Sequence, residues 1–166
     1  GCEKEFLNDP KPTSSVGEAI VFNSREGAEA LLSGIQRKYR KQFTRTDAGG
    51  MYTMYFARTV KGNDFIQNSW FNFDYDNDNR EPNYTRTIFN WEFPYYMINQ
   101  ANVLISGVEK SALADVDKKE LIAQGKAHRG FFYFQLAMEY QHTYTYDASL
   151  AAPPIYTEPS TEGKPM

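Results

Sequence analysis

The stretch that most constrains the fold is residues 117–140, DKKELIAQGKAHRGFFYFQLAMEY. Asp117, followed three residues later by Glu120, is typical of a helix N-cap and its reciprocal partner. One helical stripe runs along this segment through Leu121, Gly125, His128, Phe132, Gln135 and Glu139. Because residues 131–138 are apolar nearly all round, we expect other protein to cover this helix on several sides, with Phe132 and Leu136 in the core.

A first helix is predicted at Asn23–Phe43, with Asn23 as its N-cap and Glu26 as the partner three residues on. Its expected buried face consists of Ala28, Leu32, Ile35, Tyr39 and Phe43. Four basic residues cluster near its C-terminal end, namely Arg37, Lys38, Arg40 and Lys41. Because cations suit a helix C-terminus, we interpret this cluster as a solvated helix end.

A second helical region is predicted at Arg86–Glu109, from a stripe made of Ile88, Trp91, Tyr95, Ile98, Asn102 and Ile105. Pro94 lies inside this run, so the helix either kinks there or begins at about that residue. We interpret Asn99 and Asn102 as side chains that clamp backbone groups rather than ligand-binding residues. Gly107 and the residues up to position 116 are expected to form a short turn, so this helix should pack antiparallel to the 117–140 helix.

Residues 51–84 show no clean period and are predicted to form a long aromatic-rich loop region. Within it, Trp70, Asn72, Asp74 and Tyr75 are the candidate ligand-binding residues. Flat rings can stack on the C–H faces of a sugar, while amides and carboxylates bridge its hydroxyl groups. The alternative is that these rings pack the loop onto the helices. The spacing of Asp74, Asp76 and Asp78 resembles a calcium loop, but Asn79 stands where such a loop needs glycine, which favours a solvated acidic turn.

The two ends of the chain differ from its helical middle. Residues 1–17 hold a Pro/Ser-rich leader that begins with Cys2, which is either the acceptor of a bacterial lipid anchor or a free thiol. Near the other end, the run APPIYTEP is expected to be extended, as an edge strand or a loop.

The sequence offers no motif for a phosphate loop, a zinc protease or a nucleophile elbow, so we predict no catalytic residues, no metal site and no cofactor. His128 lies on the buried stripe, where we expect a hydrogen-bonded structural histidine. The net charge is −3 and no basic stripe is present, which argues against a nucleic-acid partner.

Several segments, in order, match the pattern of one family. The opening CEKEFLNDPKP has the form of a mature lipoprotein start, and ARTVKGNDFI holds an Arg-to-Asp loop. The segments YYMINQANVLISGVE and AHRGFFYFQLAMEY, the latter followed by APPIYTEP, complete the match. The matching positions are Arg58, Asp64, Tyr96, Asn99, Ala101, Asn102, Leu104, Arg129, Phe132, Phe134, Leu136, Tyr140, Pro154, Ile155 and Pro159. In this pattern the chain resembles the SusD-like (RagB-type) family of outer-membrane nutrient-binding lipoproteins of Bacteroidetes.

The resemblance implies a mainly α fold of tetratricopeptide-like antiparallel helix pairs, with a long aromatic-rich loop region and a short C-terminal extended strand. It implies that residues 1–17 are a lipid-anchor tether and residues 18–166 an N-terminal helical domain, with the rest of the family domain absent. It further implies a lipid anchor on Cys2, display at the cell surface, and partnership with a SusC-like TonB-dependent transporter, for which the protein captures oligosaccharide.

Three alternatives remain open at this point. The ligand could be a peptide, as in some relatives, or the chain could be a helical-repeat scaffold with no small ligand. An enzyme that acts on glycans with paired carboxylates is the third, although no pair of carboxylates stands out in the sequence.

Overall fold

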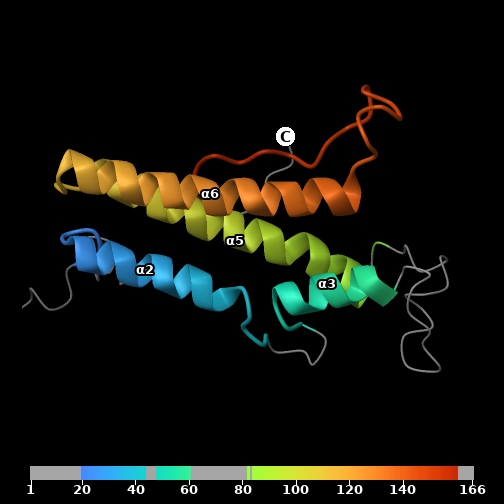
Figure 1. Ribbon diagram of the computed structural model, residues 1–166, viewed down its shortest axis with the longest axis horizontal. Coiled ribbons are helices and arrows are strands. Elements are labelled where there is room, and N and C mark those ends of the chain that lie inside the picture. The colour runs from blue at the N-terminus through green and yellow to red at the C-terminus, as the bar shows by residue number, and fades with distance from the viewer. Residues whose placement is uncertain (1–19, 44–47, 61–81, 83, 161–166) are drawn as a thin grey trace, which may run out of the picture.

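A computed structural model describes residues 20–43, 48–60, 82 and 84–160 of the chain (Figure 1). This part contains four α-helices, which are α2 (Arg25–Lys38), α3 (Met51–Val60), α5 (Thr85–Lys110) and α6 (Asp115–Tyr140). After α6 the chain turns, and residues 151–160 run back along the helices (Figure 1). The predicted mainly α fold is confirmed, whereas the tetratricopeptide-like repeat stays a prediction.

The two long helices, α5 and α6, pack side by side and antiparallel, as predicted (Figure 1). Phe132 and Leu136 of α6 are completely buried, as is Leu104 of α5. The helices approach so closely at Gly125 that a Cβ atom there would lie 2.7 Å from Cγ1 of Ile105. The predicted stripe of α6 therefore faces the core of the structure.

Other protein covers α6 less completely than its sequence predicts. Phe134 is 59% exposed and Met138 is 48% exposed, although both lie in the apolar stretch that we expected to be covered on several sides. The described residues leave the face of α6 that carries Phe134 and Met138 open, so that expectation is wrong for this face.

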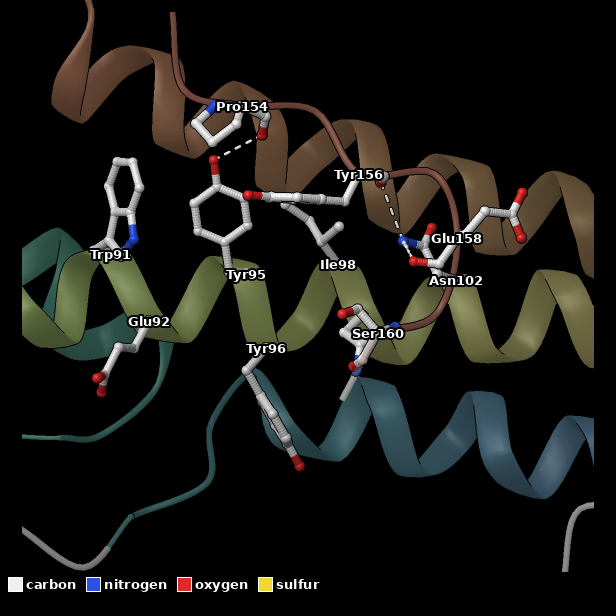
Figure 2. Close-up of a pocket in the computed structure, with 11 residues that line it drawn as sticks. Trp91, Glu92, Tyr95, Tyr96, Ile98, Asn102, Pro154, Tyr156, Glu158 and Ser160 are labelled. Atoms are coloured by element: carbon white, nitrogen blue, oxygen red, sulfur yellow. Dashed lines mark hydrogen bonds between the residues drawn. The ribbon is translucent and has the colours of Figure 1, made fainter. Parts of the chain in front are cut away.

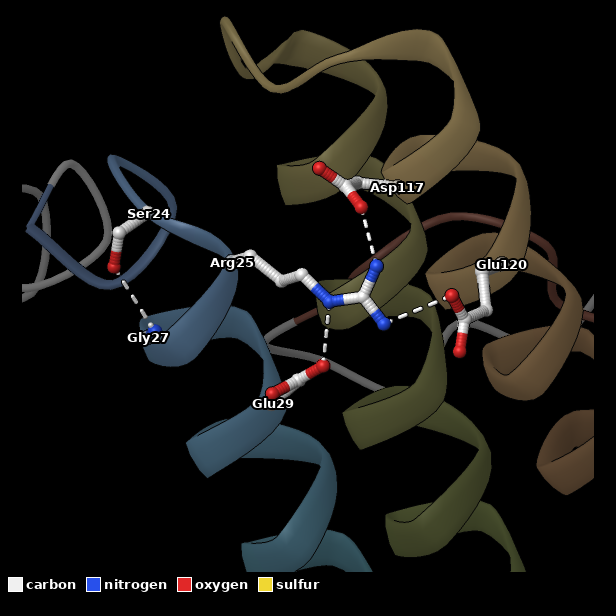
Figure 3. A network of polar contacts seen from close by, with 6 residues as sticks. All are labelled: Ser24, Arg25, Gly27, Glu29, Asp117 and Glu120. Carbon is white, nitrogen blue, oxygen red and sulfur yellow. Dashed lines mark hydrogen bonds and ion pairs between the residues drawn. The ribbon is translucent and has the colours of Figure 1, made fainter.

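The expected N-cap of α6 is also wrong. The helix begins at Asp115 with Ala114 as its N-cap residue, three residues before the predicted N-cap, and Ala114 makes no side-chain hydrogen bond. Asp117 instead binds Nη1 of Arg25, the first residue of α2 (Figure 3). Glu120 accepts a hydrogen bond of 2.8 Å from Nη2 of the same guanidinium, and Glu29 one of 2.7 Å from Nε. The carboxylate of Asp117, which could have capped α6, instead belongs to an ion-pair network between α2 and α6.

Helix α2 is shorter than the predicted Asn23–Phe43. Its N-cap is Ser24, not Asn23, and Oγ of Ser24 accepts a hydrogen bond of 3.1 Å from the backbone amide of Gly27. The helix ends at Lys38, and the chain then turns through Tyr39, which is its C-cap residue.

A helix that the sequence analysis did not predict begins immediately after Gly50. Gly50 has a φ of 61°, a left-handed conformation that suits glycine. The ten residues of α3 follow, within the region that we had expected to be a loop. Met51, Met54 and Ala57 are buried at a spacing of three, because they form the inner face of this helix.

A polar bracket joins α3, α5 and α6. Arg58 of α3 donates to Oε2 of Glu139 over 3.0 Å and to Oε1 of Gln135 over 2.6 Å. Asn90 of α5 donates to the other carboxylate oxygen of Glu139 over 3.0 Å. Each of these hydrogen bonds satisfies a polar group on a mostly buried face. We therefore interpret the polar bracket as structural.

Pro94 lies within a continuous α5, so the helix does not begin there. Nor does the helix end at Gly107, which we had expected to start the turn. Instead α5 continues to Lys110, and residues 111–114 form the link to α6.

A candidate ligand-binding groove

Residues 151–160, hereafter the C-terminal segment, are extended but belong to no strand among the residues described. The expected strand is therefore a side-chain-held loop. Its backbone groups bond to side chains of α5 and α6 instead of to a neighbouring strand. Tyr95 donates to the carbonyl of Pro154 over 2.7 Å, and Tyr133 donates to the carbonyl of Tyr156 over 2.8 Å.

Two asparagines of α5 complete this attachment. Asn102 donates over 3.1 Å to each of two carbonyls, those of Tyr156 and Glu158. Asn99 exchanges two bonds of 2.9 Å with the backbone of Ser160, as both donor and acceptor. The prediction that these two asparagines clamp backbone groups is confirmed.

Arg129 fixes the orientation of the buried Asn102 amide. Its Nη1 donates to Oδ1 of Asn102 over 2.9 Å and to the carbonyl of Thr157 over 3.2 Å. Since Oδ1 is occupied by a cationic donor, the amide nitrogen must point to the C-terminal segment. Arg129, which belongs to the family pattern, therefore holds the C-terminal segment in place, both directly and through Asn102.

Between α5 and the C-terminal segment lies a cavity of about 490 Å³, hereafter the groove (Figure 2). Residues of both elements line it, namely Trp91, Glu92, Tyr95, Tyr96, Ile98, Asn99, Asn102, Pro154, Tyr156, Glu158 and Ser160. A volume of this order falls in the range of small-molecule sites.

Two aromatic rings of the groove remain available to a ligand. Trp91 and Tyr96 are each 38% exposed. Trp91 is held by edge contact with Tyr140, at 5.0 Å between ring centroids and 83° between planes, and by a tilted contact with Tyr95 at 5.0 Å. The indole is therefore oriented before any ligand arrives.

The hydroxyl of Tyr95, one of the groove residues, already has a hydrogen-bond partner within the protein. Burial raises the pKa of Tyr95, and its hydroxyl donates to the carbonyl of Pro154. This group stays protonated and structural. The carboxylates of Glu92 and Glu158 are both exposed and can meet a ligand, whereas the half-buried Asn99, bonded to Ser160, retains only its second N–H and a second lone pair on its oxygen.

The two carboxylic acids that line the groove do not face each other. Figure 2 shows the carboxyl groups of Glu92 and Glu158 at different ends of the cavity, pointing away from each other. A two-carboxylate glycosidase needs its pair on either side of one bond. In the part of the chain described by the structure, no group of three or more His, Cys, Asp or Glu side chains could hold a metal ion.

The candidate residues from the sequence, Trp70, Asn72, Asp74 and Tyr75, lie outside the described residues. The same holds for Cys2 and for the Asp74–Asp78 turn, so their roles stay predictions. The groove itself was missed, since the sequence analysis placed Trp91 on a packed stripe. The signal that could have indicated it is the aromatic and polar row Glu92, Tyr96 and Asn99, which repeats at helical spacing beside that stripe.

His128 is hydrogen-bonded, in agreement with the structural role expected for it. Its Nδ1 meets the hydroxyl of Tyr39, and burial lowers the pKa of the imidazole. It lies apart from the residues that line the groove.

Comparison with known proteins adds the following findings. A SusD-like family model, described as starch-binding and associating with the outer membrane, matches residues 5–164. The crystal structure of a SusD-like carbohydrate binding protein from Bacteroides vulgatus superposes with a TM-score of 0.73 at 25% sequence identity. The match covers 84% of this chain and 30% of that protein, so the chain spans less than a third of its length. Among curated proteins, none matches significantly. None of the described helices is both long enough and apolar enough to cross a membrane.

Proposed function

The chain belongs to the SusD-like family, and on that premise we propose that it captures oligosaccharide at the cell surface and passes it to a SusC-like TonB-dependent transporter without catalysis. The observation that carries this proposal is the groove, which the exposed rings of Trp91 and Tyr96 line together with Glu92. The match to a carbohydrate-binding relative supports the same ligand class.

The mode of binding follows from the groups that the groove offers. A sugar ring would stack its C–H face on Trp91, while Glu92 and Asn99 accept or donate hydrogen bonds at its hydroxyl groups. The wall opposite is the C-terminal segment, whose backbone is hydrogen-bonded to side chains of α5 and α6 at five residues, Pro154, Tyr156, Thr157, Glu158 and Ser160. Because this wall is fixed beforehand, little conformational entropy is lost when the ligand binds.

The aromatic loop region would extend this surface. Trp70 and Tyr75, with Asn72 and Asp74, follow α3 in the chain, and the buried face of α3 shares the core with Phe89 of α5, half a turn before Trp91. We propose that these four residues form a second part of the binding surface.

Residues 1–17 would tether the domain of residues 18–166 to the outer membrane through a lipid on Cys2.

One titration tests the proposal. The full chain and a Trp91→Ala variant are titrated calorimetrically, first with maltoheptaose and then with a panel of neutral and acidic oligosaccharides. Removal of the stacking ring should weaken binding by about tenfold, or about 1–2 kcal/mol, by analogy with other ring-stacking contacts. The matched control is Tyr144→Ala, which removes another exposed ring, 80% exposed, that does not line the groove.

The outcomes separate the alternatives. Oligosaccharide binding that Trp91→Ala leaves intact, in a variant with unchanged circular dichroism, would move the site elsewhere. Binding of peptides but not of glycans would favour the peptide-binding alternative, and no binding of either would favour the scaffold. Release of shorter sugars from the bound glycan would contradict the absence of catalysis.

A further inference from the structure

A second hollow, of about 520 Å³, lies at the C-terminal end of α2 and is hereafter the basic hollow. Gly34 and four cationic residues line it, namely Arg37, Lys38, Arg40 and Lys41. No atom lies within 4 Å of the position that a Cβ on Gly34 would take, so the glycine leaves the hollow open. A chain whose net charge is −3 thus gathers four positive charges around one depression.

Among the described residues, no carboxylate forms an ion pair with these four side chains. The ion pairs that α2 makes with described residues all involve Arg25, at the opposite end of the helix. Within the described residues, neither Arg37 nor Arg40 forms an ion pair, and both are exposed. The helix dipole favours cations at this end, but it does not account for a hollow between them.

The basic hollow and the groove share a boundary. Nζ of Lys38 lies 5.0 Å from the centroid of the Tyr96 ring, and Tyr96 lines the groove. The same ammonium group donates over 2.6 Å to Oε1 of Gln100, one helical turn further along α5. Figure 2 shows Tyr96 projecting from α5 toward α2, away from Tyr95 and Tyr156. Tyr96 therefore joins the groove to the cations of α2.

We propose that the oligosaccharides taken by this surface are anionic, carrying uronate or sulfate groups that bind in the basic hollow. This inference rests on the proposed function and names its substrate class. The sugar rings lie over Trp91 and Tyr96, and the acidic group reaches Lys38 and the two arginines. Guanidinium groups present paired donors that match the oxygens of a carboxylate or a sulfate.

The charges of the groove and of the basic hollow determine which way an acidic oligosaccharide is oriented. Glu92 and Glu158 line the groove itself, so an acidic group on the ligand is repelled from that part and attracted to α2. Because Arg37 and Arg40 are exposed, each contact is weak and screened by salt. Four cations acting together nevertheless favour an acidic glycan over a neutral one of the same length.

The test compares matched ligands and matched variants. The full chain is titrated at low salt with a chondroitin sulfate tetrasaccharide and with the same tetrasaccharide after desulfation and carboxyl reduction. The acidic form should bind about tenfold more tightly, and about 0.5 M NaCl should remove most of that advantage. Arg37→Gln/Arg40→Gln should remove most of the advantage while leaving the neutral tetrasaccharide unaffected.

The control variant is Lys119→Gln/Lys126→Gln, which changes the net charge equally at exposed lysines of α6 that line neither hollow. It should keep the preference for the acidic ligand. Circular dichroism confirms that each variant is folded.

Each other result overturns the inference in a distinct way. If acidic and neutral forms bind equally well, the inference fails and the proposed function stands. If neither form binds but maltoheptaose or another glycan of the panel does, the inference fails and the proposed function stands; if no oligosaccharide binds, both fail. If the acidic form depends on Arg37 and Arg40 but not on Trp91, the basic hollow is a separate polyanion site. If phosphatidylglycerol vesicles bind through the two arginines and glycans do not, the hollow contacts lipid.

Discussion

Tyr39 and His128 are joined by a hydrogen bond between the end of α2 and the middle of α6, from the tyrosine hydroxyl to Nδ1 of the imidazole. The rings meet edge to face, with centroids 5.4 Å apart. Burial raises the pKa of Tyr39 to about 12, so its hydroxyl keeps its proton. Whether this hydroxyl donates to Nδ1 or accepts from it depends on the tautomer and the protonation state of His128.

Acidification should destabilise the fold through His128. Burial lowers its pKa in the folded state, whereas the unfolded chain has an ordinary histidine pKa of about 6.5. The unfolded state then binds more protons, so the free energy of unfolding falls as the pH decreases through about 6.5. Urea midpoints between about pH 5 and 8 measure this. The slope should be reduced in His128→Gln and kept in His142→Gln, whose imidazole is exposed; an unchanged slope in both would contradict the assignment.

Alanine at two glycines of α6 should have opposite effects. At Gly125 the new methyl group would collide with Ile105, which is 5% exposed, so Gly125→Ala should destabilise the α5–α6 pair by about 1–3 kcal/mol. At Gly130 no atom lies within 4 Å, so Gly130→Ala should stabilise the helix by up to about 1 kcal/mol. Thermal unfolding of both variants checks the prediction, and equal shifts would mean that the helices do not meet at Gly125.

Two phenylalanines of α6 provide a matched pair for burial. Phe132→Ala, like Leu136→Ala, should lower the free energy of unfolding by about 2–5 kcal/mol, since the side chains are fully buried and truncation leaves a cavity. Phe134→Ala, on the exposed face, should change it by about 0.5 kcal/mol or less. Denaturant titration distinguishes them. A large loss at Phe134 would indicate that something covers this face in solution.

Removal of the Asn102 amide should release the C-terminal segment. Asn102→Ala deletes two bonds to that segment and leaves Arg129 without one acceptor, at an expected cost of about 1–3 kcal/mol. Hydrogen exchange should accelerate at the backbone amides of Tyr156 and Ser160, which donate to Tyr133 and Asn99, with little change in the α5–α6 core. Asn23→Ala, at an exposed asparagine that caps nothing, is the control. Unchanged exchange in Asn102→Ala would show that other bonds hold the segment.

Lipidation of Cys2 predicts the behaviour of the protein in membrane fractions. In a native host, the parent chain should sediment with the outer membrane, because two acyl chains give durable attachment. Cys2→Ala should be released to the soluble fraction. A variant that stays with membranes as completely as the parent would refute the anchor.

The features that could be predicted from the sequence are those fixed by neighbours along the chain. The stripe through Leu121, Phe132 and Gln135 predicted which face of α6 is buried, and the short link predicted its antiparallel packing with α5. Asn102 was correctly interpreted because an amide on an otherwise packed face needs backbone partners.

The errors arose where distant residues compete. Asp117 was expected to cap its own helix, but Arg25 binds it from 92 positions away, and no local pattern contains that partner. The groove was missed for the same reason, because it forms between residues that are distant in the sequence. Its walls meet where Asn99 bonds to Ser160, 61 residues further on, so periodicity could place Trp91 on a helix face but could not say what leaves it open.

The C-terminal segment is held largely by its backbone carbonyls, those of Pro154, Tyr156, Thr157 and Glu158. Every residue type supplies the same carbonyl, so most side chains of this wall can change without loosening it. Evolution can therefore alter the lining of the groove one substitution at a time while α5 and α6 keep the wall in place. In such an arrangement the fold can be conserved while the side chains that select the ligand change.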